Sequence, residues 1–385
     1  MSVLSQIAKK IFPAVLLKEA FLAYNKVKIS TLDKILFPEH KIQPNEFLIY
    51  RKGYPFRETA VTLGTMKEGV VKEYMKDWHD WTQEEFILLF EKPCVIEPDH
   101  GWAVVGNSSL IYYSLGVSRT WFQPKPKFMA LRRRKVVTRV DKVISLRDTG
   151  EENYFHFFND VLGKLYLLKA NKVTLENSSI VVSKRLSKKP FFEYALENNL
   201  WLRSLNWIYQ EDNYIECKQA VFCKPLTHRI DLWNQVIAPL RILPTRDSSI
   251  TKIFLKRSKS RLRFIENIDE VEKACRKLGF SIVDADTLSP RQQIELFSGI
   301  RFLIGIHGAG LTNMAFTERP GCVLEIFPPA SRGYLPYHYI MLAKMFNWSY
   351  NAVIGVAGRS TLSGGFYVDP NELEKAMQDT GTDPS

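Results

Sequence analysis

From Val136 onward the sequence alternates short apolar runs with amphipathic segments, and this alternation limits the possible folds more than any other feature. The run SIVVS at 179–183 precedes the helix-like segment KPFFEYALENNL, and the run FSIVDA at 280–285 precedes QQIELFS. Strands that lie parallel in one sheet need a crossover between them, and the crossover is usually a helix. The pattern therefore predicts an α/β fold with parallel sheets covered by helices.

A Pro-containing segment, IAPLRILPTRDSS, divides this alternation into two parts. We expect two Rossmann-like domains facing a cleft, at residues 136–243 and 244–356, followed by a C-terminal loop and helix at 357–385. Residues 1–135 show only weak and mixed periodicity, and we expect a mixed α/β N-terminal extension there.

Local signals predict individual elements. In the extension we expect a helix at 82–91 and short strands at 102–105 and 110–113. The runs VVTRV and KVISL indicate two strands, and a long helix is expected at 153–170.

Helix boundaries are marked most clearly in the second half of the chain. We expect Asn267 to cap the helix IDEVEKACRKL and Gly279 to end it. Ser289 and Gln292 have the spacing of a capping box, with Pro290 at the first helical position.

Positive charge is concentrated in two segments. The chain has 53 Lys and Arg against 41 Asp and Glu, a formal net charge of +12, and residues 119–147 and 252–263 together hold an excess of 15. Such segments indicate an anionic partner: a phosphorylated small molecule, an anionic lipid or glycan, or nucleic acid. A nucleic-acid-binding protein is therefore one alternative function, although stacking on bases needs exposed aromatic rings, and few aromatics lie near the second segment.

Five scattered cysteines without a CxxC pair argue against a disulfide framework or a zinc site and favour a reducing compartment. The longest apolar stretch of the N-terminal segment, Ile11–Leu17, contains Pro13 and is too short to span a bilayer. The segment also lacks the cleavage site of a signal peptide. We expect a cytoplasmic protein whose basic N-terminus packs on the protein itself or, as the alternative, rests peripherally on an anionic membrane surface.

The segment IGIHGAGLTN at 304–313 combines an apolar strand, a glycine turn and the start of a helix. Gly308 and Gly310 let the backbone approach a ligand, and the N–H groups at a helix start attract phosphate. Because Asn313 stands where a dinucleotide fingerprint has its third glycine, an NAD-dependent oxidoreductase is a weaker alternative. Glu325, in the next apolar strand, indicates either a contact to ribose hydroxyls or a structural ion pair.

The loop after the strand ITKIFL carries Lys256, Arg257 and Arg263. A loop that follows a strand in an open α/β sheet lies at the carboxyl edge, where ligands bind. These cations repel one another unless an anion joins them, so we expect contacts to a diphosphate. The triplet Asp-Ala-Asp at 284–286 has the spelling of a metal-binding motif, but it precedes a loop, and we expect no metal there.

On the helix at 153–170, His156 and Asp160 lie one turn apart on a stripe outside the apolar face, with Asn159 beside them. A histidine and a carboxylate at this spacing suit a general base and its orienting partner. A plain His–Asp pair on the helix surface is the other interpretation.

In combination these motifs resemble glycosyltransferase family 61. Members of that family share a helix Asn-Tyr-x-His-x-x-x-Asp, an Arg-rich loop ending in Arg-x-x-x-Asn, a turn His-Gly-Ala-x-Leu, and a following Glu-x-Phe-Pro. The resemblance covers roughly residues 135–330. The corresponding residues here are Asn153, Tyr154, His156, Asp160, Arg257, Arg263, Asn267, His307, Gly308, Ala309, Leu311, Glu325, Phe327 and Pro328.

The resemblance implies a GT-B fold and inverting, metal-independent and cofactor-free transfer of a hexosyl or pentosyl group from a nucleotide sugar, with a UDP-sugar as the default. It implies that the C-terminal domain holds the donor and the N-terminal domain a glycan or lipid-linked glycan acceptor. The N-terminal part shows no membrane anchor, which indicates a bacterial-type enzyme of capsular or other surface polysaccharide biosynthesis. Nucleic acid is not an expected partner.

For the displacement we expect Asp160 to act as the base and His156 to orient it, with the reverse assignment as the alternative. We expect Asn153, Tyr154 and Asn159 to bind the acceptor. The expected donor-binding residues are Lys256, Arg257, Arg263, Asn267, His307, Gly308, Ala309, Gly310, Leu311 and Glu325.

Overall fold

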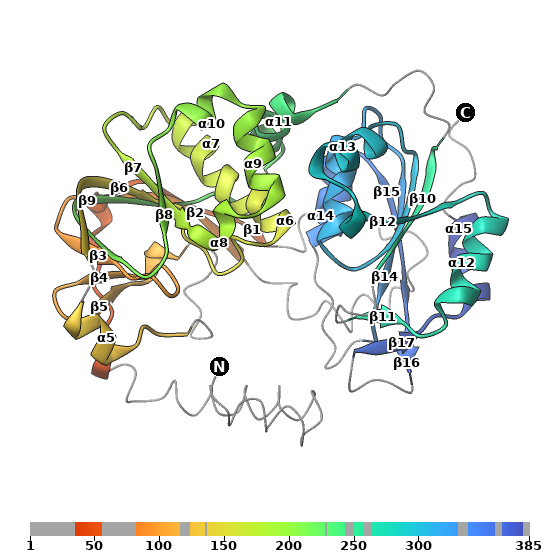
Figure 1. Cartoon of the computed structure of the whole chain (residues 1–385), viewed down its shortest axis with the longest axis horizontal. Coiled ribbons are helices and arrows are strands. Elements are labelled where there is room, and N and C mark those ends of the chain that lie inside the picture. Colours follow the sequence, from red (N-terminus) through yellow and green to blue (C-terminus); the bar gives the residue numbers. More distant parts are fainter. Residues whose placement is uncertain are drawn as a thin grey trace. The chain divides into compact units, whose positions relative to one another are not determined.

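Figure 1 shows the computed structural model of the chain. It describes residues 35–55, 82–115, 124–134, 137–227, 229–242, 250–257, 263–329, 338–358 and 364–379. The N-terminal segment expected to pack on the protein or on a membrane lies outside these residues, as do residues 258–262 of the basic loop. The described residues form two compact units: unit 1 holds residues 35–53 and 83–236, and unit 2 holds residues 54, 55 and 82 and those from Ile237 onward.

The described part of unit 1 contains a mixed sheet of nine strands in the order β5-β4-β3-β9-β6-β7-β8, with β2 paired to β9 and β1 paired to β2. Strands β9, β6, β7 and β8 run parallel, whereas β9 is antiparallel to both β2 and β3. The strands are β1 (Phe47–Pro55), β2 (Thr82–Phe90), β3 (Cys94–Ile96), β4 (Ala103–Val105), β5 (Ser109–Ile111), β6 (Val137–Ser145), β7 (Ser179–Ser183), β8 (Trp207–Gln210) and β9 (Tyr214–Lys224).

Several expectations for the first half of the chain need correction. The segment 82–91, expected as a helix, is strand β2. Its apolar residues 86–88 are all buried, and a short apolar run of this kind cannot be distinguished from a buried helix by periodicity. The two strands expected from the runs VVTRV and KVISL are one strand, β6 (Val137–Ser145), because β9 pairs along nearly its whole length. Strands β2 to β5 share a sheet with β6–β9, whereas we expected a separate extension up to residue 135. The short strands expected near 102–105 and 110–113 are present as β4 and β5.

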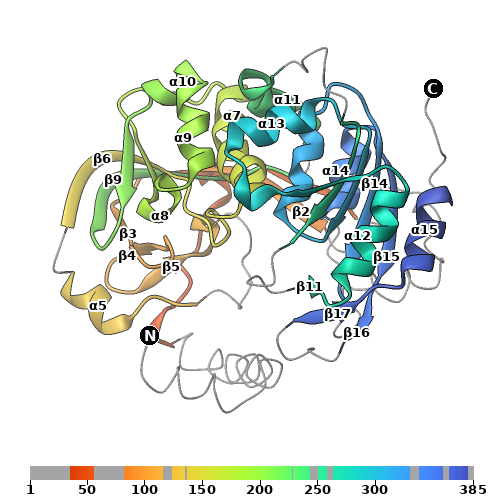
Figure 2. The ribbon, with the colours of Figure 1, turned by 45° about the vertical axis from the view of Figure 1, so that its right-hand side comes forward.

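A continuous helical run follows β6 and confirms the helix expected at 153–170. It consists of α6 (Tyr154–His156), the π-helical segment η4 (Phe157–Leu162) and α7 (Gly163–Ala170). All six residues of η4 are buried. Figures 1 and 2 show α7 beside α9 (Pro190–Glu197) and α10 (Leu200–Ser204). The other helices of unit 1 are α5 (Phe128–Arg133), α8 (Lys184–Ser187) and α11 (Ile230–Ile237).

Unit 2 contains a parallel sheet with the order β12-β10-β13-β14-β15, as the alternation in the sequence predicts. A small second sheet joins β11, β17 and β16. The strands are β10 (Lys252–Lys256), β11 (Phe264–Ile265), β12 (Ser281–Asp284), β13 (Phe302–Ile306), β14 (Cys322–Phe327), β15 (Ser349–Ile354), β16 (Val356–Ala357) and β17 (Gly365–Tyr367).

Helices cover both faces of this parallel sheet. In Figures 1 and 2, α12 (Ile268–Lys277) and α15 (Pro370–Asp379) lie together on one side of the sheet. The elements α13 (Pro290–Ser298), η7 (Ala309–Phe316) and α14 (His338–Met345) pack against one another. Apolar side chains of the strands, such as Phe254 and Leu324, form a core with Val271 of α12 and Leu373 of α15. Burial on both faces explains why these strands are continuous apolar runs.

The helix boundaries of unit 2 agree closely with their sequence signals. Ser289 and Gln292 form the expected capping box, and Gly279 ends α12 with a left-handed φ of 80°. Helix α12 begins directly after Asn267, as expected, although the Asn267 side chain makes no cap hydrogen bond. Among the described residues, every helix is too short or too polar to cross a membrane.

Candidate functional site

Two carboxyl edges of parallel strands carry the residues singled out by sequence. In unit 1 the parallel strands lie in the order β8-β7-β6-β9. Along the chain, β7 and β8 follow on one side of β6 and β9 then lies on its other side, so the strand order reverses between β6 and β9. In unit 2 it reverses between β10 and β13. In parallel sheets, ligands bind outside the carboxyl ends of the two strands that flank such a reversal. His156 and Asp160 follow β6, whereas Arg257 and His307 follow directly after β10 and β13.

The helix that follows β6 begins with a capping interaction. Asn153 Oδ1 accepts hydrogen bonds from the backbone N–H groups of Phe155, at 2.9 Å, and His156, at 3.4 Å. An asparagine N-cap satisfies donors that have no partner within the helix. The cap therefore sets where the helix starts and, with it, the direction in which His156 projects.

His156 and Asp160 form a hydrogen-bonded pair with 2.6 Å between Nδ1 and Oδ2. The second carboxylate oxygen, Oδ1, accepts from Asn159 Nδ2 at 2.9 Å. Asn159 Oδ1 in turn accepts from the indole N–H of Trp233 at 3.0 Å. The Asp160 side chain is 11% exposed and that of His156 26%. The carboxylate is thus held on both oxygens, and the imidazole is the more accessible of the two groups.

Burial and charge act in opposite directions on this pair. Burial disfavours protonated His156, but the hydrogen bond to Asp160 and the charges of Asp160 and Asp148 outweigh it, so the pKa of His156 is raised. Burial likewise disfavours ionised Asp160, but His156, Lys164 and Asn159 together lower the pKa of Asp160. The pair is therefore an ionised carboxylate that supports a basic imidazole.

The three residues expected to bind an acceptor help to build the helix that carries the His156–Asp160 pair, here called the dyad. Asn153 caps it, and Asn159 links Asp160 to Trp233. The Tyr154 ring packs edge-on against Phe158 and Phe191, at centroid distances of 4.9 and 5.4 Å, and burial raises the pKa of its hydroxyl. The sequence predicted a surface stripe here, but the helix start is packed against other parts of the protein. These side chains therefore have partners within the protein.

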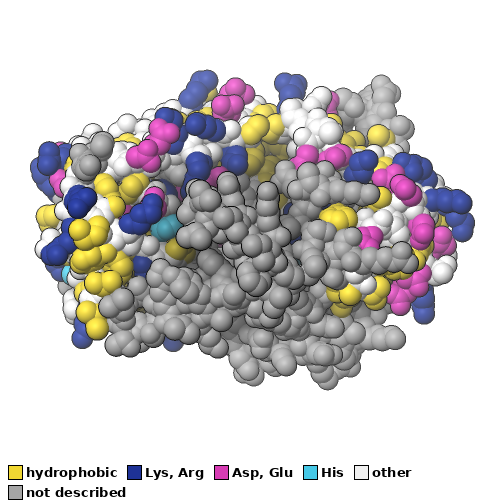
Figure 3. All heavy atoms as spheres, turned by 60° about the horizontal axis from the view of Figure 1, so that its bottom comes forward, with side chains coloured by type: hydrophobic (Ala, Val, Ile, Leu, Met, Phe, Trp, Pro, Cys, Tyr) yellow, Lys and Arg dark blue, Asp and Glu magenta, His cyan; other side chains and the backbone are white. Residues whose placement is uncertain are grey.

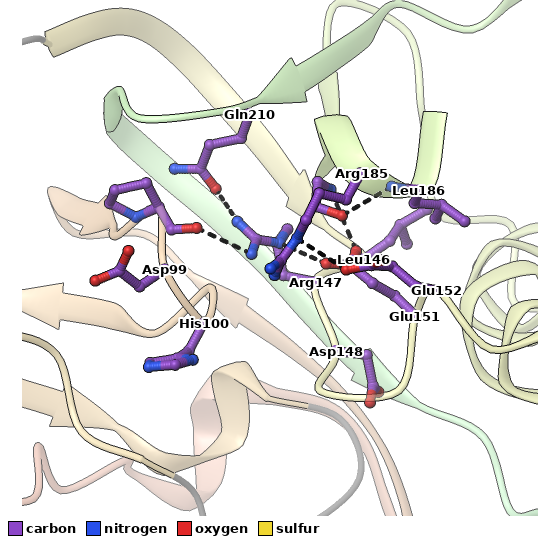
Figure 4. A network of polar contacts seen from close by, with 12 residues as sticks. Asp99, His100, Leu146, Arg147, Asp148, Glu151, Glu152, Arg185, Leu186 and Gln210 are labelled. Carbon is purple, nitrogen blue, oxygen red and sulfur yellow. Dashed lines mark hydrogen bonds and ion pairs between the residues drawn. The ribbon is translucent and has the colours of Figure 1, made fainter. Parts of the chain in front are cut away.

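A buried network at the same edge was missed by sequence reasoning. Arg147, 1% exposed, donates from Nε to Glu151 Oε1 at 3.0 Å, from Nη2 to the Pro98 carbonyl at 3.1 Å, and from Nη1 to the Gln210 side chain. Glu151 also accepts from the N–H of Ser183 at 3.2 Å. Figure 4 shows the guanidinium among these groups. The network joins the carboxyl ends of β3, β6, β7 and β8. The sequence signal that could have predicted it is the spacing of Arg147 and Glu151, four residues apart after an apolar strand.

This network changes the interpretation of the basic segment 119–147. Arg147 is an internal charge, Arg139 pairs with Glu216 at 3.0 Å, and Arg134 donates to the Gly106 carbonyl. On the face drawn in Figure 3, Lys and Arg side chains of the described residues are interspersed with Asp and Glu. Three positive charges of the segment, those of Arg134, Arg139 and Arg147, thus have partners in the protein itself.

In unit 2, His307 lies at the end of β13 in a buried polar cluster. Its Nδ1 is 2.5 Å from Oε1 of Glu325 on the neighbouring strand β14, and the Tyr350 hydroxyl donates to Glu325 Oε2 at 2.6 Å. The ring stacks on Phe327, with centroids 5.3 Å apart and planes inclined by 20°. Glu325 is fully buried, and the structural ion pair is the interpretation that fits. The ribose contact expected for Glu325 is not supported, because both of its oxygens are engaged internally.

Arg257 contacts the His307 turn, and Arg263 interacts with residues that contact His307. Arg257 Nη1 donates to the carbonyl oxygen of His307 at 3.2 Å, and a Cβ on Gly308 would lie 2.6 Å from the same nitrogen. Glycine at 308 therefore makes room for the guanidinium. Arg263 interacts electrostatically with Tyr339 and Glu325, and burial lowers the pKa of its guanidinium. The Nζ atom of Lys256 lies 3.8 Å from Oε1 of Glu272. The structure thus brings Arg257, Arg263 and His307 to one edge of the sheet.

Other predicted donor-binding residues have structural roles. Asn267 is bonded through its side chain to the backbone N–H and carbonyl of Val368, at 3.1 and 2.8 Å. Leu311 is fully buried, and its Cδ2 would be 2.9 Å from a Cβ on Gly305. Gly310 packs on Leu255, whose Cδ2 would be 2.5 Å from a Cβ at that position. Ala309 begins η7. Ala309, Gly310 and Leu311 thus shape the turn that follows His307, whereas Asn267 ties the start of α12 to Val368.

The triplet at 284–286 is a local cap, because the Asp284 side chain accepts from the N–H of Asp286 at 3.0 Å. All five cysteines are buried thiols. Within the described ranges, no group of three or more His, Cys, Asp or Glu side chains is arranged to hold a metal ion.

A comparison with known proteins matches a range of the sequence that includes residues from both edges. Residues 154–324 match the model of a family described as Glycosyltransferase 61. This range begins in the dyad helix and ends in β14, so it includes His156, Asp160, Arg257 and His307. No protein in the curated set matches the chain. The family match supports glycosyltransferase family 61 for this part of the chain and, with it, a glycosyltransferase role.

Proposed function

We propose that this protein is an inverting glycosyltransferase that moves a sugar from a nucleotide sugar to a hydroxyl group of a glycan or lipid-linked glycan. The observation that carries the proposal is the His156–Asp160 pair, which lies within the family-matched residues at the carboxyl end of β6. In this reaction the acceptor hydroxyl loses its proton and its oxygen bonds to the anomeric carbon. The bond from that carbon to the diphosphate breaks. Such a displacement needs a base for the acceptor and positive charge for the leaving group.

His156 is the better candidate for the base, in the reverse of the assignment first expected. Asp160 has both oxygens bonded, to His156 and Asn159, and its pKa is lowered. A carboxylate in this setting is a weak proton acceptor. The imidazole has its Nδ1 fixed by Asp160, a raised pKa and the larger exposure. This is the arrangement in which a carboxylate orients a histidine base.

Unit 2 supplies positive charge for a diphosphate. Arg257 and Arg263 lie beside the His307 turn at the strand-order reversal. Charge-assisted hydrogen bonds contribute about 1.5–3 kcal/mol each, so two arginines can stabilise a leaving diphosphate without a metal. UDP is the default nucleotide. A GT-B arrangement, a role in bacterial surface polysaccharide synthesis and a cytoplasmic, membrane-peripheral location belong to the same proposal.

A donor screen tests the reaction class. The full chain is incubated with UDP-, GDP- and CMP-sugars, with and without EDTA, and released nucleotide is separated by chromatography. Release from one donor class, unchanged by EDTA, supports the proposal, and NMR of the product's anomeric proton reports inversion. NADH and a labelled RNA are included as ligands in thermal-shift and filter-binding arms. Binding of either one, with no nucleotide release from any sugar donor, would favour an oxidoreductase or a nucleic-acid-binding protein instead.

Substitutions at the dyad test the base. His156→Gln removes the proton acceptor, and Asp160→Asn keeps the shape of the side chain but removes its charge. Loss of general base catalysis lowers turnover by roughly 100-fold or more, while donor binding is expected to survive in both variants. Near-normal turnover of His156→Gln would remove His156 from the role.

Arg257→Ala tests the donor contact, with Arg276→Ala as its control. Arg276 is an exposed arginine of the same unit, paired with Glu272 at 2.8 Å. We expect UDP affinity, measured by calorimetry, to fall about 10- to 100-fold for Arg257→Ala and to stay unchanged for Arg276→Ala. Equal affinities in both variants would show that Arg257 makes no donor contact.

A further inference from the structure

Lys164, in the first turn of α7, is a lysine whose ammonium group is inside the protein. Its side chain is 1% exposed, and that of its partner Asp148 is fully buried. Lys164 Nζ donates to Asp148 Oδ2 at 3.0 Å and to the backbone carbonyls of Arg147, at 3.1 Å, and Leu146, at 3.4 Å. All three acceptors belong to the chain that leaves the carboxyl end of β6.

Stability alone does not account for such a pair. Removing two ions from water costs several kcal/mol each, and replacing a buried ion pair by apolar residues of similar volume is often neutral or stabilising. Lysine is almost never fully buried unless it is paired. The pair therefore calls for a role in fixing a particular geometry, and the segment it fixes leads directly to the dyad.

A chain of contacts runs from Lys164 to the imidazole. The Asp148 oxygen that does not face Lys164, Oδ1, accepts from the N–H of Gly150 at 3.2 Å. Gly150 packs on the His156 ring so closely that a Cβ at 150 would lie 2.8 Å from Cγ and 2.9 Å from Cδ2. Asp160 holds the same ring through Nδ1. The imidazole is thus held between Asp160 and a turn whose position depends on Lys164.

The same groups determine the charge around the dyad. Asp148 raises the pKa of His156, and Lys164 lowers the pKa of Asp160. Lys224, at the end of β9, interacts electrostatically with Asp148, Asp160 and Glu84, and burial lowers the pKa of its ammonium group. With His156 neutral, the two aspartates balance the two lysines. Glu84 adds one further formal negative charge near Lys224.

We propose that Lys164, acting through Asp148 and Gly150, is a positioning residue that holds the His156 imidazole in the orientation required of the base. The inference rests on the proposed function, because His156 must be the base for its orientation to affect turnover. The effect on His156 does not depend on the reaction: loss of the Lys164–Asp148 pair changes the environment of His156 whether or not the protein transfers a sugar.

The test uses the double variant Lys164→Met/Asp148→Asn, which removes both charges and leaves neither ion unpaired. Ile215→Val, a core change in β9 of the same unit, serves as a control for reduced stability. The histidine signals of 13C-labelled protein are titrated by NMR, with His156→Gln used to assign the His156 signal. Turnover with the donor found in the screen is measured across pH on the same variants.

We expect the pKa of His156 to fall in the double variant, because the attraction of Asp148 for the imidazolium is lost. Turnover is expected to fall roughly 10- to 100-fold, the scale of a displaced catalytic group, with the acid limb of its pH profile moved to lower pH. Ile215→Val should leave both unchanged. Lys164→Gln, which keeps a donor at the position, serves if the double variant does not fold.

The outcomes separate the two proposals. An unchanged His156 titration and unchanged turnover in a folded double variant overturn the positioning role. A changed titration together with normal turnover of His156→Gln overturns His156 as the base, while Lys164 still positions the ring. A changed titration with reduced turnover in both variants supports both.

Discussion

Gly150→Ala is expected to reduce turnover by displacing a single ring, the imidazole of His156. The added Cβ would lie 2.8 Å from Cγ, 2.9 Å from Cδ2 and 3.3 Å from Cβ of His156. Carbon atoms in favourable contact are about 3.5–4.0 Å apart, so the ring must move by roughly 0.7 Å or more. The 2.6 Å hydrogen bond to Asp160 holds the other side of the ring. A misplacement of this size reduces turnover roughly 10- to 100-fold.

The loss of turnover in Gly150→Ala should be distinguishable from a loss of stability. Gly150 does not have a left-handed backbone, so alanine is allowed there and removes about 0.4–1 kcal/mol of unfolded-state entropy. Overpacking typically costs about 1–3 kcal/mol. The net loss in the free energy of unfolding, measured by urea denaturation, should therefore lie between about zero and 2.6 kcal/mol.

The assay is nucleotide release with the preferred donor, with Gly163→Ala as the matched control. Gly163 begins α7, and a Cβ there would lie 3.3 Å from Cγ of Pro225, with no histidine atom within 4 Å. We expect near-normal turnover for Gly163→Ala and the large loss for Gly150→Ala. Normal turnover of folded Gly150→Ala would refute the claim that the position of the His156 ring determines activity.

Three further outcomes follow from the geometry. Because the pKa of His156 is raised, kcat/KM should fall with decreasing pH at a midpoint above the usual histidine value of about 6.5. The stability that protonated His156 contributes should be fully present below that usual value and lost as the pH rises through the raised pKa. Urea denaturation at several pH values measures this loss. Tyr350→Phe leaves one oxygen of buried Glu325 without its hydroxyl donor and should lower the free energy of unfolding by about 1–3 kcal/mol. Phe254→Ala removes a fully buried ring from β10 and should lower the melting temperature, at a cost of about 3–5 kcal/mol.

The local signals were reliable where neighbouring residues decide the structure. The capping box at Ser289, the left-handed Gly279 and the long helix after β6 are set by nearby backbone and side-chain groups, so they could be read from the sequence. The i, i+4 spacing of His156 and Asp160 likewise placed the two side chains together on any helix. The strand β2 was missed because pairing with a segment more than a hundred residues later buries it.

The sequence by itself determined the α/β alternation, the helix that carries the dyad and the resemblance to a glycosyltransferase family, because periodicity and short motifs act over a few residues. Only the tertiary structure decided which side chains remain available for chemistry. Glu325 bonds to His307 and Tyr350, and Asn267 bonds to Val368. Lys164 of α7 has its ammonium group buried against the chain that leaves β6, where no pattern marked it. Such roles depend on which distant groups share a buried space, since a polar side chain removed from water must find its hydrogen-bond partner there.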